Sequence, residues 1–179
     1  MNFWQGERVR LRAVEPEDAA FFFTLQQDTE RGRLLDFLPP SSKAALESWA
    51  REQSQKELEN DVFQWIIEAA GEPVGSIVTH TVSPRNGTFS YGLEVARNHQ
   101  RKGYAKEAVT LVLHYYFGEL RYQKAHISVQ ENNAGSLALH RSSGFKHEGT
   151  QRRMVFQKGR YLDLLLFGLT ADEFNDQTR

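Results

Sequence analysis

Hydrophobic and polar residues alternate along much of the chain with the period of two that is typical of strands. The clearest example is residues 88–95, where the apolar side chains fall on one face and Ser90, Gly92 and Glu94 on the other. This pattern predicts a strand with one buried face. Comparable extended runs predict further strands at residues 9–13, 62–69, 73–82, 125–129, 152–157 and 161–169.

Short runs that contain Gly, Pro or Asn separate several of these strands. Gly71 follows residues 62–69, Pro84 to Gly87 precede residues 88–95, and Gly159 lies between the last two strands. Such residues favour tight turns. Residues 62–82 and 152–169 therefore predict two hairpins.

Helical periodicity, with apolar residues three or four positions apart, appears in four places. One helix is predicted after Pro16, which suits a first helical turn, and a second at residues 44–58, after the break at Pro39 and Pro40. A third begins at Gly103 and stops near Gly118, and a short fourth follows residue 129. The order of elements predicts an α+β fold with a mixed central sheet of about seven strands flanked by about four helices.

The size of the chain predicts one domain. It has 179 residues, of which 40% are hydrophobic, enough to bury a substantial core. We expect a single domain over residues 1–179, in which the polar segment 171–179 is frayed.

Charge and cysteine content narrow the possible classes of function. The formal net charge is −1, which differs from the basic balance typical of nucleic-acid-binding proteins. The chain has no cysteine, so it can form no disulfide, thiolate metal site or cysteine nucleophile. No apolar run approaches the roughly 18 residues that cross a bilayer, and the N-terminus lacks a signal-peptide pattern. We expect a cytoplasmic protein without nucleic-acid, membrane or metal partners.

A basic turn connects the strand at residues 88–95 to the next helix. It consists of Gln100, Arg101, Lys102, Gly103, Tyr104 and Ala105, and Lys106 follows. The start of a helix leaves backbone N–H groups without internal partners and carries partial positive charge, so anions bind there. Gly103 has no Cβ to keep a phosphate away from the backbone, and the basic side chains add charge. The turn is typical of a site for a phosphate ester.

The spacing of the turn excludes two common phosphate-binding motifs. A Walker A loop has two glycines five positions apart followed by Lys and Ser or Thr, and a dinucleotide fingerprint has three glycines within six residues. Neither is present. The turn resembles the Gln/Arg-x-x-Gly-x-Gly/Ala signature of the GNAT N-acetyltransferase superfamily, which Gln100, Gly103 and Ala105 match in order. In that superfamily the loop binds the pyrophosphate of acetyl-CoA, so the resemblance implies acetyl-CoA as the donor.

Three further segments resemble one subgroup of this superfamily, the ribosomal-protein alanine acetyltransferases (RimJ/RimL-like). They are residues 7–19, 133–145 and 159–163. The four matches occur in the expected order and cover nearly the whole chain. The resemblance therefore implies the GNAT fold and transfer of an acetyl group to an amine.

Acetyl transfer from a thioester to an amine needs a neutral amine, a polarised carbonyl and a proton for the thiolate. Asn133 is a good helix cap, and Ser136 and His140 follow it at positions that share one helix face. In related enzymes the Asn contacts the coenzyme, and a Tyr four residues before the closing Gly often protonates the thiolate. His140 stands at that position, either as a proton donor or as a residue that only lines the coenzyme channel.

Glu94 is the second candidate for proton transfer. Several members of the superfamily use a carboxylate on this strand as a base that acts through water, whereas the alternative is a side chain solvated on the polar face. The resemblance also implies that the strand parts from its parallel neighbour at residues 125–129. The backbone of Leu93 and Val95 would then bind the pantetheine amides, and an N–H near Val95 would polarise the carbonyl.

The acceptor is less well defined by the sequence. Related enzymes recognise it with the region at residues 32–40, which here holds Arg33, Asp36 and Phe37 and no cluster of carboxylates that would favour a polyamine. We expect direct attack in a ternary complex by a protein N-terminus, a small amine or an antibiotic. Two alternatives remain, a non-catalytic acyl-CoA-binding regulatory module and an acyltransferase that uses another acyl-CoA. A homodimer is compatible with the resemblance, because relatives often pair through their C-terminal strands.

Overall fold

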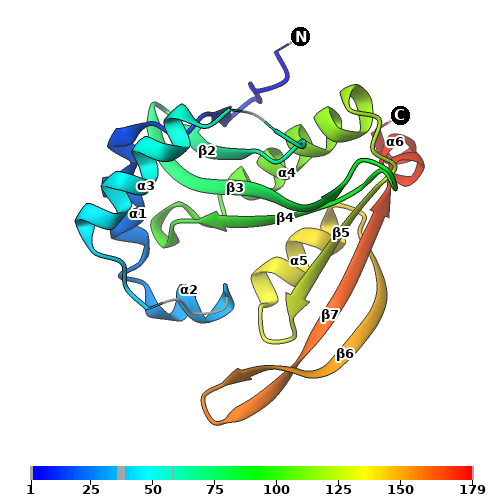
Figure 1. Cartoon of the computed structure of the whole chain (residues 1–179). Helices are drawn as coiled ribbons and strands as arrows, with labels where there is room; N and C mark the ends of the chain where they lie inside the picture. The colour runs from blue at the N-terminus through cyan, green and yellow to red at the C-terminus, as the bar shows by residue number, and fades with distance from the viewer. Residues whose placement is uncertain (1, 36–38, 58, 179) are drawn as a thin grey trace.

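The computed structural model describes residues 2–35, 39–57 and 59–178, which form one seven-stranded sheet (Figure 1). The spatial order is β1-β2-β3-β4-β5-β7-β6, and all neighbours are antiparallel except β4 and β5, which are parallel. The predicted mixed sheet of seven strands is confirmed. Its strands are β1 Arg10–Arg12, β2 Gln64–Ala69, β3 Glu72–Ser83, β4 Thr88–Val95, β5 Lys124–Gln130, β6 Lys146–Gln157 and β7 Arg160–Thr170.

The described residues form six α-helices, two more than the four that the sequence indicated. They are α1 Ala19–Leu25, α2 Thr29–Leu34, α3 Lys43–Gln55, α4 Tyr104–His114, α5 Ala134–Ser142 and α6 Ala171–Thr178. The predicted helix at residues 44–58 ends at Gln55, and Leu58 lies outside the described residues. The additional helices are α2 and α6.

The expectation that residues 171–179 fray is wrong for residues 171–178. Phe174 of α6 is 5% exposed and packs against the rings of His114 and Phe117. The helix begins with a reciprocal cap, in which Thr170 N–H donates to the Glu173 carboxylate (3.0 Å) and Glu173 N–H donates to Thr170 Oγ1 (3.3 Å). The buried aromatic ring and the capping box stabilise this helix against the rest of the fold. Arg179 lies outside the described residues.

The sheet is covered on both faces. Ile66 packs in a small cluster with Val14, Ala19 of α1 and Ala50 of α3. Its neighbours on β2, Trp65 and Ile67, belong to the larger cluster around α4. Because successive strand residues point to opposite faces, the two clusters lie on opposite sides of the sheet. The larger one is rich in aromatic rings, with Phe89 stacked on Tyr116 at 3.9 Å.

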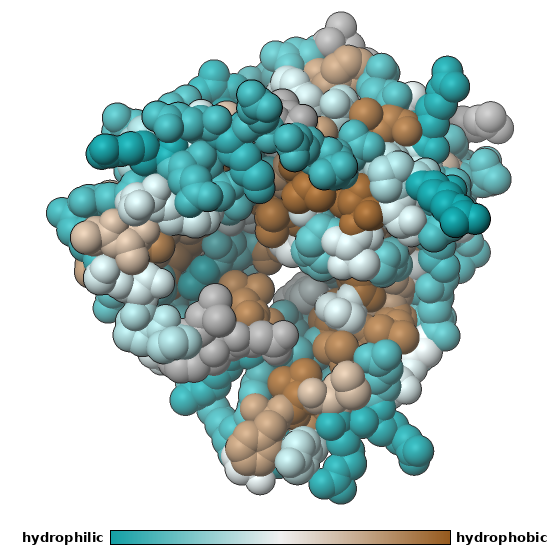
Figure 2. All heavy atoms as spheres, viewed as in Figure 1, coloured by the Kyte–Doolittle hydropathy of each residue, from teal (hydrophilic) through white to brown (hydrophobic). Residues whose placement is uncertain are grey.

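The parallel pair β4 and β5 is joined only at its beginning. Thr88 pairs with Lys124 and Phe89 with Ala125, and beyond these residues the strands diverge (Figure 1). On their other edges β4 stays paired with β3 as far as Val95, and β5 with β7 as far as Gln130. The sheet is therefore split in the middle. In the same view, Figure 2 shows hydrophobic side chains gathered around a hollow at the centre of this face and hydrophilic side chains around its periphery.

Candidate functional site

The basic turn lies directly before α4, as the sequence predicts. Gly103 caps the helix with φ of +85°, a left-handed conformation that side chains with a Cβ seldom adopt. A Cβ at this position would lie 2.6 Å from Nη1 of Arg8. The helix that begins at Tyr104 thus presents its first N–H groups beside a residue without a side chain, with Arg101 and Lys102 exposed next to it.

Neighbouring residues hold the turn in place. Arg8 Nη1 donates to the Lys102 carbonyl (3.2 Å), and Glu107 of α4 accepts from the Arg8 backbone N–H (2.8 Å). Gln100 Nε2 donates to the Val95 carbonyl (3.1 Å), which links the turn to the end of β4. Lys106 donates to the Ser142 carbonyl at the end of α5 (3.0 Å). Sequence reasoning missed Arg8 and Glu107, because nothing local shows that residues so far apart in the chain meet.

The end of β4 exposes one backbone edge beside this turn. Leu93 pairs with Ile77 and Val95 with Gly75 of β3, while the opposite edge faces the split between β4 and β5. Backbone N–H and C=O groups at such an edge can bind an extended amide chain as an added strand would. The geometry therefore matches the parting of the strands that the resemblance implied.

Asn133, Ser136 and His140 have the arrangement that their spacing predicts. Asn133 Oδ1 accepts from Ser136 N–H (3.1 Å) and caps α5. One turn later, His140 Nδ1 lies 2.8 Å from the Ser136 carbonyl oxygen and 3.2 Å from Ser136 Oγ. The three residues share one face of α5, and His140 is only 5% exposed.

The surroundings of His140 fix the state of its imidazole. Burial lowers the pKa of His140 to about 4, against the smaller opposing effect of the Ser136 carbonyl, so the ring is neutral at pH 7. A carbonyl oxygen can only accept, so Nδ1 carries the hydrogen and Nε2 is the unprotonated nitrogen. In this state Nε2 accepts a hydrogen bond or a proton and does not donate one.

A buried donor lies next to this buried acceptor. The rings of Tyr91 and His140 are 5.7 Å apart, and Tyr91 is 6% exposed. Burial raises the pKa of Tyr91 well above its usual value, so its hydroxyl keeps its proton. Among the described residues, neither the Tyr91 hydroxyl nor His140 Nε2 has a hydrogen-bond partner. Unsatisfied polar atoms are costly in a protein interior, which favours a site that a ligand completes.

The shifted pKa of His140 predicts a specific dependence of stability on pH. The folded state disfavours the charged ring, so the contribution is fully present above the unfolded pKa of 6.5 and is lost as the pH falls towards 4. Between pH 7 and pH 4 the free energy of unfolding of the parent protein should fall by about 3 kcal/mol more than that of His140→Phe. Chemical denaturation at several pH values measures this difference. Equal curves for the parent and His140→Phe would contradict the assignment.

Glu94 lies on the opposite face of β4 from Tyr91, as the alternation predicts. It is not simply solvated, because its side chain is 13% exposed and forms an ion pair with Arg31 of α2. Its other carboxylate oxygen accepts from Ser76 Oγ (3.0 Å) on β3. The structure therefore brings Glu94 and His140 to two sides of the same strand rather than into contact.

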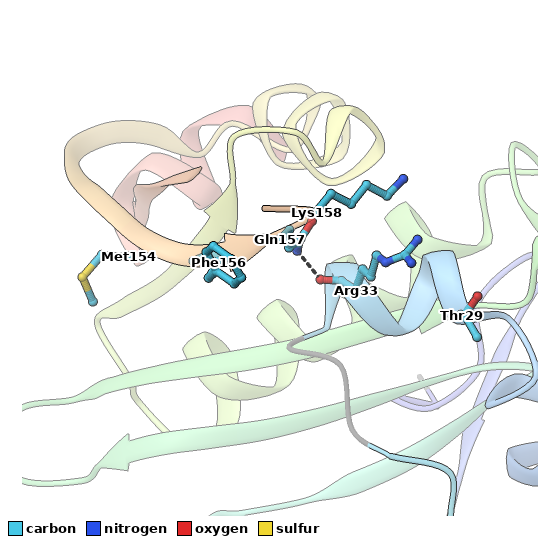
Figure 3. Close-up of a pocket in the computed structure, with 7 residues that line it drawn as sticks. Thr29, Arg33, Met154, Phe156, Gln157 and Lys158 are labelled. Carbon is cyan, nitrogen blue, oxygen red and sulfur yellow. Dashed lines mark hydrogen bonds between the residues drawn. The ribbon is translucent and has the colours of Figure 1, made fainter. Parts of the chain in front are cut away.

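A hollow of about 710 Å³ lies between α2 and the end of β6 (Figure 3). Figure 3 shows Thr29 and Arg33 on the helix, Phe156 and Gln157 at the end of β6, and Lys158 directly after it. A smaller hollow of about 280 Å³ adjoins it, and Arg33, Gln157 and Lys158 border both. This is the region where the resemblance places the acceptor. Asp36 and Phe37, named with it from the sequence, lie outside the described residues.

Comparison with known proteins identifies the family of the chain and the type of reaction that its members catalyse. Residues 8–146 match the family model described as an acetyltransferase (GNAT) domain. The chain belongs to the GNAT acetyltransferase family. The match spans the basic turn, the split between β4 and β5, and the face of α5 that carries His140. The protein is an N-acetyltransferase, and the turn, the exposed edge of β4 and the unpartnered buried atoms fit acetyl-CoA.

Relatives are similar over almost the whole chain. The SPbeta prophage-derived uncharacterized N-acetyltransferase YokL of Bacillus subtilis is 40% identical over 176 residues, which cover 97% of this chain and 96% of the relative. The putative ribosomal N-acetyltransferase YdaF of the same organism is 25% identical over 96% of each chain. A crystal structure of spermidine N-acetyltransferase from Vibrio cholerae in complex with CoA and spermine has a TM-score of 0.83 and 22% identity, covering 95% of this chain and 99% of that one. The last comparison shows the shared fold.

The described residues form neither a membrane-spanning helix nor a cluster of metal ligands. None of the helices they form is both long and apolar enough to cross a bilayer. They also contain no group of three or more His, Asp or Glu side chains that could hold a metal ion.

Proposed function

We propose that this GNAT acetyltransferase transfers the acetyl group of acetyl-CoA to a primary amine by direct attack in a ternary complex. The observation that carries the proposal is the split between β4 and β5, which opens beside the glycine turn at the start of α4. The proposed coenzyme site places the pyrophosphate at residues 100–106 and the pantetheine along the backbone of Leu93 and Val95. Asn133 and Ser136 line the same channel from α5.

Acetyl-CoA supplies the activated thioester, and the residues around it would manage charge and protons. A backbone N–H near Val95 would donate to the thioester carbonyl as negative charge develops on its oxygen. Glu94 would accept the proton that the attacking amine loses, through water. On the other side of β4, the Tyr91 hydroxyl would donate to the sulfur. The leaving thiolate would take its proton from solvent while the Tyr91 hydroxyl holds it by a hydrogen bond. His140 Nε2 would then accept a hydrogen bond from the thiol S–H rather than act as the proton donor, because burial favours its neutral state.

Three further proposals concern the class of acceptor, the subgroup of the family and the oligomeric state. The similarity to YdaF supports a RimJ/RimL-like enzyme that acts on a protein N-terminus, and the complex of the Vibrio relative adds polyamines to the candidates. Small amines and aminoglycoside-like antibiotics remain in the set. Exposed Met154, Phe156 and Tyr161 on the edge hairpin β6–β7 support a homodimer through the C-terminal strands. A single domain over residues 1–179 and a cytoplasmic location stay predictions.

The proposal is tested by the release of free CoA from acetyl-CoA with a panel of amines. The panel contains peptides with different N-termini, monoamines, spermidine, spermine and aminoglycosides, and mass spectrometry identifies the acetylated product. Turnover of at least one amine well above the rate of acetyl-CoA hydrolysis is expected. Tight binding of acetyl-CoA without turnover of any amine would favour the regulatory module. Faster reaction with succinyl-CoA or a longer acyl-CoA would favour a different acyl donor.

A further inference from the structure

Helix α2 is attached to both sides of the split between β4 and β5. On the β4 side, Arg31 forms its ion pair with Glu94. In the same region Arg97, just after β4, donates from Nε and Nη2 to the Asp28 carboxylate at 3.0 and 3.3 Å. Asp28 is also the N-cap of α2, where it accepts from the Arg31 backbone N–H (3.1 Å). These contacts fix the beginning of α2 to the end of β4.

The other end of α2 is attached to the β5–β7 side. The Arg33 carbonyl accepts hydrogen bonds from Gln130 (3.2 Å), the last residue of β5, and from Gln157, the last residue of β6 (Figure 3). Lys158 donates to Glu30 of the helix (3.2 Å). Helix α2 therefore crosses the open end of the split, on the face of the sheet that carries Glu94.

The ion pair between Arg31 and Glu94 is mostly withdrawn from solvent. Their side chains are 19% and 13% exposed, and Ser76, which donates to Glu94, is 6% exposed. Arg31 Nη1 donates to the Leu25 carbonyl (2.9 Å), whereas its buried Nε has no hydrogen-bond partner among the described residues. Burial lowers the pKa of Arg31, but a guanidinium stays charged at accessible pH. Glu94 and Ser76 thus form a partly desolvated site that already holds an organic cation.

We propose that Glu94 and Ser76 form the subsite for the cationic amine of the acceptor, and that Arg31 occupies this subsite until the acceptor displaces it. The inference rests on the proposed function, because it takes Glu94 as the carboxylate that meets the acceptor. A buried carboxylate left without a cation is costly, so exchange of one cation for another is a low-cost way to open the site. A guanidinium keeps its protons at accessible pH, whereas a bound ammonium group can lose one to Glu94 and become the neutral nucleophile.

This arrangement selects for one class of acceptor. An alkylammonium group can replace the guanidinium on Glu94, whereas an amine that is uncharged at neutral pH brings no positive charge to replace it. The enzyme should therefore prefer aliphatic primary amines and protein N-termini that carry a charge over aromatic amines of similar size.

The test uses methylguanidinium, which resembles the end of the Arg31 side chain. Titration calorimetry measures its binding to the full chain with CoA present, so the result does not depend on turnover. Arg31→Ala should bind methylguanidinium at least about tenfold more tightly than the parent protein, and Arg31→Ala/Glu94→Gln should lose that gain. If Arg31→Ala is unstable, Arg31→Gln can replace it, because it too removes the guanidinium from Glu94.

Arg97→Ala is the matched control. It removes the ion pair between Arg97 and Asp28, the N-cap of α2, but leaves Arg31 on Glu94, so it should loosen the helix without gaining affinity for methylguanidinium. Equal binding by the parent and both Arg31 variants would overturn the inference. A gain in Arg97→Ala as large as that in Arg31→Ala would also overturn it, since loosening alone would then explain the effect. Failure of the proposed function would appear separately, as the absence of acetylated product in the amine panel.

Discussion

Replacement of Glu94 by Gln is expected to lower kcat by about 10²-fold to 10⁴-fold, the usual contribution of a general base. The amide keeps the size of the side chain and can still accept from Ser76 Oγ, but it cannot take the proton that the amine loses. Steady-state kinetics with the best acceptor measures the change. The variant should also lose the acidic limb of the pH profile of kcat, because that limb reports protonation of the base.

Glu148→Gln is a suitable control for this variant. Glu148 lies on β6, where it pairs with Lys124 at 2.6 Å, and it takes no part in the proposed site. Its replacement should change kcat little. An unchanged kcat and an unchanged acidic limb in Glu94→Gln would show that the carboxylate only holds Arg31. Thermal unfolding is needed alongside, since the substitution leaves Arg31 without its ionic partner.

Replacement of Gly103 by Val is expected to weaken the binding of CoA by about 10²-fold, an estimate based on the loss of several phosphate hydrogen bonds. A branched side chain is strongly disfavoured at a φ of +85°, and its Cβ would meet Arg8 Nη1 at 2.6 Å. Arg8 in turn supports the Lys102 carbonyl. The change therefore disturbs both the helix start and the residue that holds it. Titration calorimetry with CoA measures the affinity.

Gly71→Val separates strain in the backbone from damage to the coenzyme site. Gly71, in the turn between β2 and β3, has nearly the same φ of +82°, and nothing lies within 4 Å of the position of its Cβ. The variant should lose stability through the same backbone strain but keep its affinity for CoA. Undiminished affinity in Gly103→Val would refute the assignment of the turn.

The basic turn and the sheet could be predicted because their signals are local. Alternation in residues 88–95, the glycine at position 103 and the apolar stripe of α4 lie within one continuous stretch of sequence. Asn133, Ser136 and His140 share a face of α5 for the same reason, since helical spacing alone places them together.

The missed elements depend on contacts between distant parts of the chain. Helix α2 has only six residues, among them Gly32, and is held by Glu94, Gln130 and Gln157 rather than by helix propensity. The capping box Thr170 to Glu173 is a signal for α6 that the polar composition of the segment hid.

The burial, ion pairs and charge states of individual side chains were the hardest features to predict from the sequence. The sequence placed Glu94 on a polar strand face and left open whether it is solvated, while the structure buries it against Arg31. It allowed His140 either charge state at neutral pH, and only packing against Tyr91 and Phe145 selects the neutral ring. Burial and charge pairing are tertiary properties, which spacing within a sequence does not specify.

A crystal structure of the protein with bound CoA would show whether the split between β4 and β5 is the coenzyme site. We predict the pyrophosphate on the backbone N–H groups of residues 101–105 and the pantetheine amides paired with Leu93 and Val95. The sulfur should lie between Tyr91 and His140, in the split between β4 and β5. Coenzyme bound instead in the hollow beside α2, or β4 and β5 closed along their length with CoA elsewhere, would contradict it.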